Sequence, residues 1–258
     1  MGALSTYRAQ AALAIRTSFS DRTNFVLLVL GMAVNNGFWL ILWFLFFTGF
    51  RQVGGWRMGD LARLLGILYT LFGVATVFAG GYRDMAGAIL RGEIDALLTQ
   101  PKPVLARMLA RESIASAWGD LSTGVLILAV SARLDLAGAA LAVAAVAIGA
   151  VAWLSAGVIF SSLAFWVAGA RSLSRDLMDF TLMFASYPGP IYGGWAKVAA
   201  FTVLPAGFVA IAPVDLVRRP SLEAAGIAVG AAAAYAALAL AVFSLGLRRY
   251  RRGASPGS

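Results

Sequence analysis

Long apolar runs separated by short polar segments make up most of the chain. A helix needs roughly 20 apolar residues to cross the hydrocarbon core of a bilayer. The runs cover residues 24–50, 61–81, 108–131, 136–169, 175–212 and 222–247. The pattern therefore predicts an all-α polytopic membrane protein, with six transmembrane helices in a single transmembrane domain over residues 1–258.

The run at 175–212 cannot form one regular helix. From Arg175 to Tyr187 a helix rises only about 18 Å, roughly half a bilayer. There the sequence reads YPGPIYGGW, Tyr187 to Trp195, whose prolines and glycines interrupt a helix. Irregular backbone at that depth must be buried in protein or line a wet cavity. We expect either a broken span or a helix with a re-entrant piece before the last span.

Charge sets the expected orientation. The chain is 60% hydrophobic and 13% charged, with a net charge of +9. If 175–212 crosses once, both termini share a side that holds fourteen of the 21 Lys and Arg residues. The positive-inside rule makes that side cytoplasmic. Because the aromatic residues lie inside the apolar runs, the basic excess indicates membrane anchoring and no nucleic-acid partner.

Residues 1–23, before the first span, have modest amphipathic character. Leu4, Tyr7, Ala11 and Ile15 share one helical face. We expect a helix lying in the cytoplasmic interface, in contact with membrane lipid; the alternative is a loose N-terminus.

The residue inventory excludes most chemistry. The chain has no cysteine and no histidine, which removes disulfides, thiolate chemistry, imidazole acid–base catalysis and most zinc sites. It also has no G-x-x-x-x-G-K-[ST] phosphate loop. We therefore predict no catalytic residues, no metal site and no cofactor in this chain, which is not expected to be an enzyme.

Asp179 is the clearest ionisable residue inside a predicted span. One interpretation, which we favour, is an i, i+4 ion pair with Arg175. The other is a proton or ion relay, as in secondary transporters.

A charged segment, RGEIDALLTQPKP, lies between the second and third spans. Ile94, Leu97 and Leu98 form an apolar face, whereas the charged side chains lie largely off it. The pattern predicts a short amphipathic helix, Arg91 to Leu98, at the cytoplasmic surface, ended by Pro101 and Pro103.

This segment carries a family resemblance. The residues I-L-R-G-E-I-D-A-L-L-T-Q-P, Ile89 to Pro101, resemble the "rGelD.lLl.P" signature of a GEID-containing subgroup of bacterial type-two ABC exporter permeases. Four further pieces agree in order, so the resemblance covers nearly the whole chain: Gly54-Gly55-Trp56, Phe165-Trp166, Tyr187-Pro188 with Tyr192, and LPAGFVAIAP at Leu204–Pro213.

The resemblance implies the membrane subunit of an ABC exporter in the bacterial cytoplasmic membrane. It implies six spans with both termini cytoplasmic, an N-terminal interfacial helix, a coupling segment at 84–100 and re-entrant elements before the last span. Two permease chains, identical or homologous, would pair over two ABC ATPase subunits that bind ATP and Mg. The expected cargo is amphipathic or lipid-, peptide- or drug-like, with a polysaccharide still open. The alternative is a secondary transporter or channel that uses Asp179.

Two sets of residues follow from this hypothesis. The expected ATPase-coupling residues are Arg83, Asp84, Arg91, Gly92, Glu93 and Asp95. The expected substrate path is lined by Asn35, Asn36, Trp39, Asp179, Tyr187 and Tyr192. Asn35 and Asn36 have an equal alternative in hydrogen bonding between helices, and we favour a lipid-belt position for Trp43 and Trp56.

Overall fold

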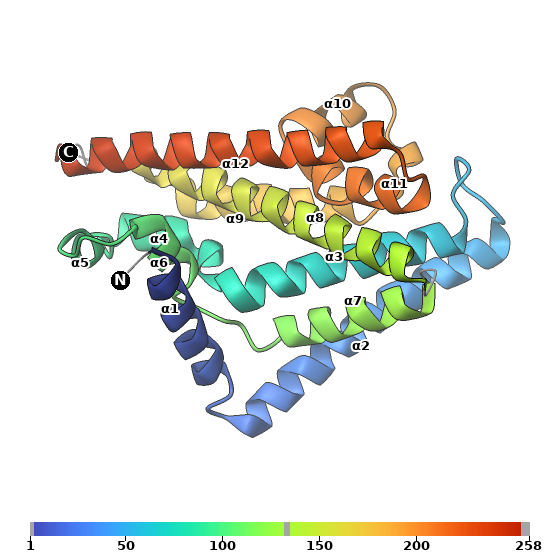
Figure 1. Ribbon diagram of the computed structural model, residues 1–258, viewed down its shortest axis with the longest axis horizontal. Coiled ribbons are helices and arrows are strands. Elements are labelled where there is room, and N and C mark those ends of the chain that lie inside the picture. Colours follow the sequence, from blue (N-terminus) through green and yellow to red (C-terminus); the bar gives the residue numbers. More distant parts are fainter. Residues whose placement is uncertain (1–2, 132–134, 254–258) are drawn as a thin grey trace.

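The computed structural model describes residues 3–131 and 135–253, and within them it is built from helices (Figure 1). The α-helices are α1 (Ala3–Ser18), α2 (Arg22–Gly49), α3 (Met58–Ala79), α4 (Met85–Leu90), α5 (Asp95–Leu98), α6 (Val104–Leu109), α7 (Ala117–Ser131), α8 (Leu136–Ser162), α9 (Ala170–Ala185), α10 (Gly194–Thr202), α11 (Ala212–Arg218) and α12 (Leu222–Arg251). The 3₁₀ turns are η1 (Gly80–Asp84), η2 (Leu163–Phe165) and η3 (Gly189–Ile191), and η4 (Gly207–Ile211) is a π-helical turn. The all-α prediction is confirmed for the described residues.

Four helical stretches are long and apolar enough to cross a membrane. They are Arg22–Gly49, Met58–Leu90, Leu136–Phe165 and Leu222–Arg251, and α7 is a shorter apolar helix. α1 occupies most of the predicted interfacial segment, of which residues 1–2 lie outside the described part. The predicted first, second, fourth and last spans thus correspond to helices.

Within the predicted third span, residues 108–131, the main helix is α7 (Ala117–Ser131), which is shorter than the span. The helix begins only at Ala117, because the backbone after α6 leaves the helical path. A β-carbon on Gly80 would lie 2.8 Å from the Glu112 carbonyl oxygen, so this connection runs tightly against η1. Because Gly80 has no side chain, the segment between α6 and α7 can pack directly against the η1 backbone. This packing accounts for the non-helical connection between α6 and α7.

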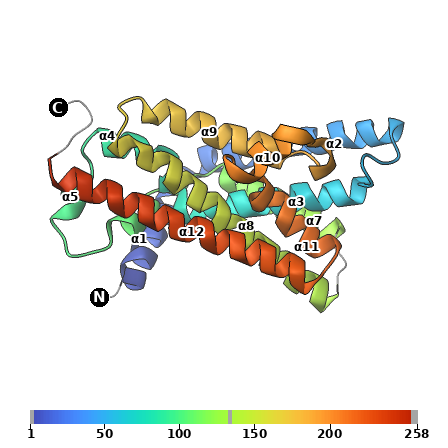
Figure 2. The same ribbon diagram turned by 90° about the horizontal axis from the view of Figure 1, so that it is seen from above.

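α3 is the centre of the bundle. It packs against α7 and α8, while α12 covers the other side of α8 (Figures 1 and 2). The crossing of α3 and α7 is close: a β-carbon on Gly124 would lie 2.5 Å from the Thr70 backbone nitrogen. Small residues allow such approach between membrane helices. α2 lies outside this core and exposes most of its apolar surface.

The predicted break before the last span is present, with wider limits. α9 begins at Ala170 and ends before Pro188, and irregular turns then alternate with short helices as far as Arg218. α9 runs from the end of the bundle that holds α4 to the end that holds α10 and α11 (Figure 2). The start of α1 and the end of α12 both lie near α4, α5 and α6, away from α10 and α11 (Figure 1).

Trp43 and Trp56 are not lipid-belt residues. Their exposed fractions are 7% and 3%. The Trp43 ring packs edge-on against Tyr187, with centroids 5.5 Å apart, and the Arg218 guanidinium lies 4.2 Å from the Trp56 ring centroid. Both tryptophans therefore hold the irregular region after α9 against the rest of the bundle.

Candidate functional site: a coupling segment and two joined cavities

Gly92 breaks the segment that we predicted as one helix from Arg91 to Leu98. Its φ angle is +73°, in the left-handed region, which terminates the helical path after α4. Turns follow, and only one helical turn, α5, forms before Pro101. The predicted amphipathic helix is therefore a shorter helix-turn unit, because the local pattern did not include the backbone reversal at the glycine.

Three contacts hold this unit to the bundle, and one of them is a side-chain hydrogen bond between Asp95 and Tyr250 on α12. The Ile94 side chain is fully buried against α4 and α6, in a cluster that includes Met85 and Val104. The buried Arg107 donates a 3.1 Å hydrogen bond to the Leu97 carbonyl at the end of α5. The exposed tip is a stretch of small and polar side chains: Asp95, Ala96, Thr99, Gln100 and Lys102. The unit is thus an anchored projection with a free outer surface.

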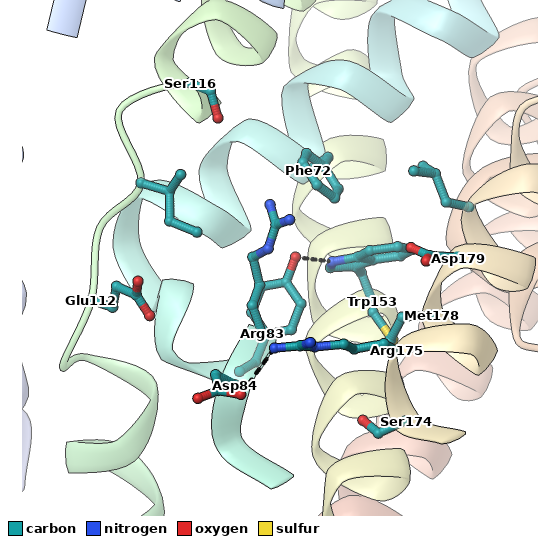
Figure 3. Close-up of a pocket in the computed structure, with 13 residues that line it drawn as sticks. Phe72, Arg83, Asp84, Glu112, Ser116, Trp153, Ser174, Arg175, Met178 and Asp179 are labelled. Atoms are coloured by element: carbon teal, nitrogen blue, oxygen red, sulfur yellow. Dashed lines mark hydrogen bonds and ion pairs between the residues drawn. The ribbon is translucent and has the colours of Figure 1, made fainter. Parts of the chain in front are cut away.

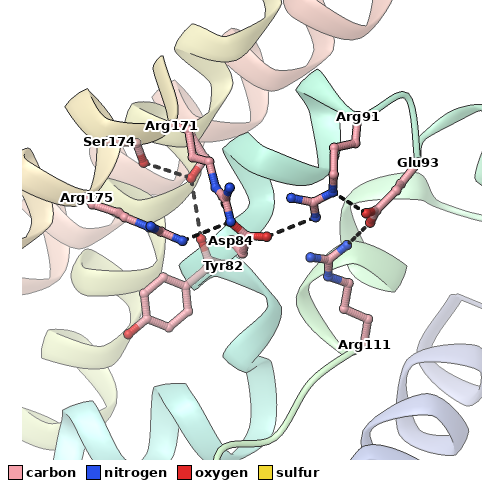
Figure 4. A network of polar contacts seen from close by, with 9 residues as sticks. Tyr82, Asp84, Arg91, Glu93, Arg111, Arg171, Ser174 and Arg175 are labelled. Atoms are coloured by element: carbon pink, nitrogen blue, oxygen red, sulfur yellow. Dashed lines mark hydrogen bonds and ion pairs between the residues drawn. The ribbon is translucent and has the colours of Figure 1, made fainter. Parts of the chain in front are cut away.

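Asp84 is the centre of a network between this region and α9 (Figure 4). Its carboxylate accepts from Arg91 at 2.9 Å, from Arg171 at 2.9 Å and from Arg175 at 3.2 Å. Arg171 and Arg175 lie one turn apart on α9, so a single carboxylate ties η1 to that helix. We name this set, together with Glu93 and Arg111, the Asp84 network.

Glu93 extends the network to Arg111, in the segment that follows α6. It accepts from Arg91 at 2.6 Å and from Arg111 at 2.7 Å (Figure 4). The hydrogen bond from Arg91, supported by that from Arg111, lowers the pKa of Glu93. Arg91 bridges Asp84 and Glu93, so three of the predicted coupling residues form one connected group.

Arg83 has a different position from Asp84, although we predicted one role for both. Its guanidinium lies 5.9 Å from the Phe72 ring centroid and points into a cavity, away from the Asp84 network (Figure 3). Arg83 and Asp84 are adjacent in the 3₁₀ turn η1, but their side chains point in different directions. Arg83 thus lies with the residues predicted for the substrate path.

The favoured ion pair between Arg175 and Asp179 is wrong. Arg175 contacts Asp84 instead, and within the described part of the chain Asp179 forms no ion pair. Asp179 lines the same cavity as Arg83 (Figure 3).

Two cavities meet between α2, α3, α7 and α9. The first, of about 460 Å³, lies beside the Asp84 network and reaches Tyr82, Glu112 and Trp153. The second, of about 520 Å³, is rich in aromatic side chains, and we name it the aromatic cavity. Phe72, Arg83, Asp179 and Leu182 line both. The aromatic cavity is lined by five of the six predicted path residues: Asn35, Asn36, Trp39, Asp179 and Tyr187.

Tyr192 is the exception among the predicted path residues. Its hydroxyl donates a 2.6 Å hydrogen bond to the Phe184 carbonyl, and its ring stacks on Phe184. It therefore supports the chain after the break in α9 and does not line the aromatic cavity.

Asp120 is a cavity residue that the sequence reasoning missed. The Asn36 amide donates a 2.8 Å hydrogen bond to Asp120 Oδ1, which joins α2 to α7. For Asn36 this fits the alternative of bonding between helices, whereas Asn35 is exposed at the cavity rim. The sequence does carry a signal for Asp120: an acidic residue inside the apolar run WGDLSTGVLIL indicates a position that faces protein or water.

No metal centre is apparent in residues 3–131 and 135–253, where no three acidic side chains come together with suitable spacing. The polar groups of the site are instead engaged in ion pairs or face the cavities.

The comparisons with known proteins agree with this geometry. A family model described as ABC-2 family transporter protein matches residues 33–254. The chain belongs to the ABC-2 transporter family. The match includes the Asp84 network, the broken segment after α9 and every residue that lines the two cavities except Met32. The comparisons with curated proteins and with solved structures gave no match.

Membership of the ABC-2 family makes the chain a type-two ABC permease, a multi-pass membrane subunit for transport that is not itself catalytic. Proteins of this family normally work with ATPase subunits.

Proposed function

We propose that this chain is the transmembrane permease subunit of an ATP-driven ABC exporter that belongs to the GEID-containing subgroup of bacterial permeases. It moves an amphipathic or lipid-, peptide- or drug-like substrate outward across the cytoplasmic membrane. A separate ATPase binds ATP and Mg and supplies the energy. The observation that carries the proposal is the connection between an exposed projection, the Asp84 network and a cavity in one ABC-2 chain.

Six crossings, with both termini in the cytoplasm, fit this function. α7 is extended by the connection after α6, and α9 with the turns that follow supplies the fifth crossing before α12. The start of α1, the end of α12 and α5 lie at the same end of the bundle, which supports a cytoplasmic position for the projection (Figure 1). α1 then lies along the same membrane surface.

Force enters at the exposed tip of α5. Two ATPase subunits close around ATP and press on this tip, with Asp95 as a polar contact. Because Ile94 and Arg107 anchor the unit, the displacement passes to α4 and η1 and, through Asp84, to Arg171 and Arg175 on α9. α9 then moves as a stiff body, a rigid-body switch that opens the cavities toward the outer side.

The aromatic cavity needs a protein or water neighbour on its open side. Asn35 and Asp179 are exposed at its rim, and polar groups facing lipid are costly. A second permease chain, identical or homologous, covers this side in our account. The substrate then passes between two chains, along Trp39 and Tyr187.

Flux measurements separate this function from the alternative of a secondary transporter or channel that relies on Asp179. Purified permease is reconstituted in liposomes with and without its ABC ATPase, and export of an amphipathic reporter is followed. We expect flux only with the ATPase and hydrolysable ATP. Ion- or proton-driven flux through the permease alone, abolished by Asp179→Asn, would establish the alternative instead.

A further inference from the structure

The floor of the aromatic cavity includes a buried carboxylate, Asp120, of which one oxygen has no hydrogen-bond partner in the described part of the chain. Asp120 is 4% exposed and Asn36 is 2% exposed. Asn36 satisfies Oδ1, but Oδ2, equally shielded, has no hydrogen-bond partner among residues 3–131 and 135–253. A buried carboxylate oxygen without a donor is energetically unfavourable. Since Asp120 lines the cavity, a positively charged group bound there compensates the charge of this carboxylate.

The charged groups that face the cavity favour a cation. They are Asp120 on α7, Asp179 on α9 and Arg83 on η1. Arg83 lies over the Phe72 ring, where the two cavities join, and makes no ion pair in the described part of the chain. With all three groups ionised, the lining carries one net negative charge. Arg83 then partly balances the two acids while the cavity is empty.

The remaining lining suits an apolar and aromatic body. Trp39, Trp43, Tyr69 and Tyr187 line the cavity, and aromatic rings attract organic cations as well as apolar groups. The volume of about 520 Å³ lies within the range of sites for drug-sized ligands. The cavity thus has a charged floor, a charged rim at Asp179 and aromatic walls.

We propose that the aromatic cavity binds the transported substrate as an amphipathic organic cation. The positive charge lies beside the Asp120 carboxylate and balances it across the cavity wall, Asp179 attracts it at the rim, and the apolar body lies against Trp39 and Tyr187. This inference rests on the proposed transport function and narrows its substrate class from amphipathic to cationic amphipathic molecules.

The test is equilibrium binding of radiolabelled tetraphenylphosphonium to the purified full-length permease in lipid nanodiscs, without ATPase or ATP. Tetraphenylborate, of nearly the same shape and opposite charge, is the matched competitor. We expect saturable tetraphenylphosphonium binding that excess tetraphenylborate does not displace. Asp120→Asn should weaken binding at least tenfold and Asp179→Asn severalfold, whereas Arg83→Gln should strengthen it.

Asp176→Asn is the control, because Asp176 is exposed on α9 and does not line the cavity. It should leave the affinity unchanged. If Asp120→Asn fails to fold, the other two variants still test the proposal, because Asp179→Asn should lower the affinity for tetraphenylphosphonium and Arg83→Gln should raise it. Equal binding of both ions, or affinity that ignores Asp179 and Arg83, would overturn the proposal. Binding is measured without ATP, so its failure is distinguishable from failure of ATP-driven transport.

Discussion

The Arg175 guanidinium on α9 contacts the Asp84 carboxylate on η1 at 3.2 Å and leaves the nearer acid in sequence, Asp179, to the cavity. Asp84 and Arg175 are 91 residues apart. The contact links the region that we assign to ATPase docking with the helix that precedes the broken segment. It also frees Asp179 from the ion pair expected at i, i+4.

Asp84→Asn should weaken this link. The substitution keeps the size of the side chain but removes the charge that three arginines contact. Hydrogen bonds to charged groups contribute roughly 1–3 kcal/mol, less where they are partly exposed. We expect a Tm lowered by several degrees and transport reduced more strongly than ATP hydrolysis. Asp176→Asn, an exposed acid on α9, should change neither; equal losses in both variants would contradict the role of the network.

Gly92→Ala should disturb the projection without touching its charges. A residue with a β-carbon at φ +73° carries strain of about 1–2 kcal/mol. Gly92→Asn is the matched variant, because asparagine tolerates the left-handed region. We expect ATPase stimulation by the permease to fall in the alanine variant and to be largely retained in the asparagine variant. The same activity in both would show that the backbone reversal is unimportant.

Gly124→Ala should destabilise the bundle centre. The added carbon would lie 2.5 Å from the Thr70 backbone nitrogen, so α3 and α7 must separate. Overpacking of this kind costs typically 1–3 kcal/mol. Gly226→Ala on α12 meets no atom within 4 Å and should leave Tm unchanged or raised. Thermal unfolding in detergent compares the two, and equal stability would contradict the close crossing.

Cysteine labelling tests the orientation of the chain in the membrane. Because the sequence has no cysteine, each single-cysteine variant carries one labelling site. Gln100→Cys at the tip should react with a membrane-impermeant maleimide only after cells are permeabilised. Lys197→Cys on α10, at the other end, should react in intact cells. The reverse pattern would contradict cytoplasmic termini and the assignment of the projection.

Apolar length and proline position were sufficient for much of the fold. Long runs predicted α2, α3, α8 and α12, and Pro188 marked the end of α9, because these effects are local. The same local view did not locate the start of α7 at Ala117, where packing against Gly80 decides it. It also placed Trp43 and Trp56 at the lipid surface, since burial depends on segments far along the chain.

The candidate site was predictable in its residue types but not in its pairings. Five path residues line one cavity because asparagines and tyrosines inside apolar runs avoid lipid. The partner of Arg175 and the direction of Arg83 depend on tertiary arrangement, and hydrogen bonding between Asn36 and Asp120 spans 84 residues. Gly92 was expected as a coupling residue, and its positive φ emerges only from the folded chain.

The central claim is that an ATPase subunit docks on the tip of α5 and drives the permease through it. Photo-crosslinking tests this most directly. A benzophenone maleimide is placed on Ala96→Cys at the tip, or on Lys197→Cys at the opposite end, in the reconstituted complex with an active ABC ATPase. The account predicts cross-linking to the ATPase from position 96, sensitive to ATP, and none from position 197. Cross-linking only from position 197, or none from position 96 in a complex that hydrolyses ATP and transports, would contradict it.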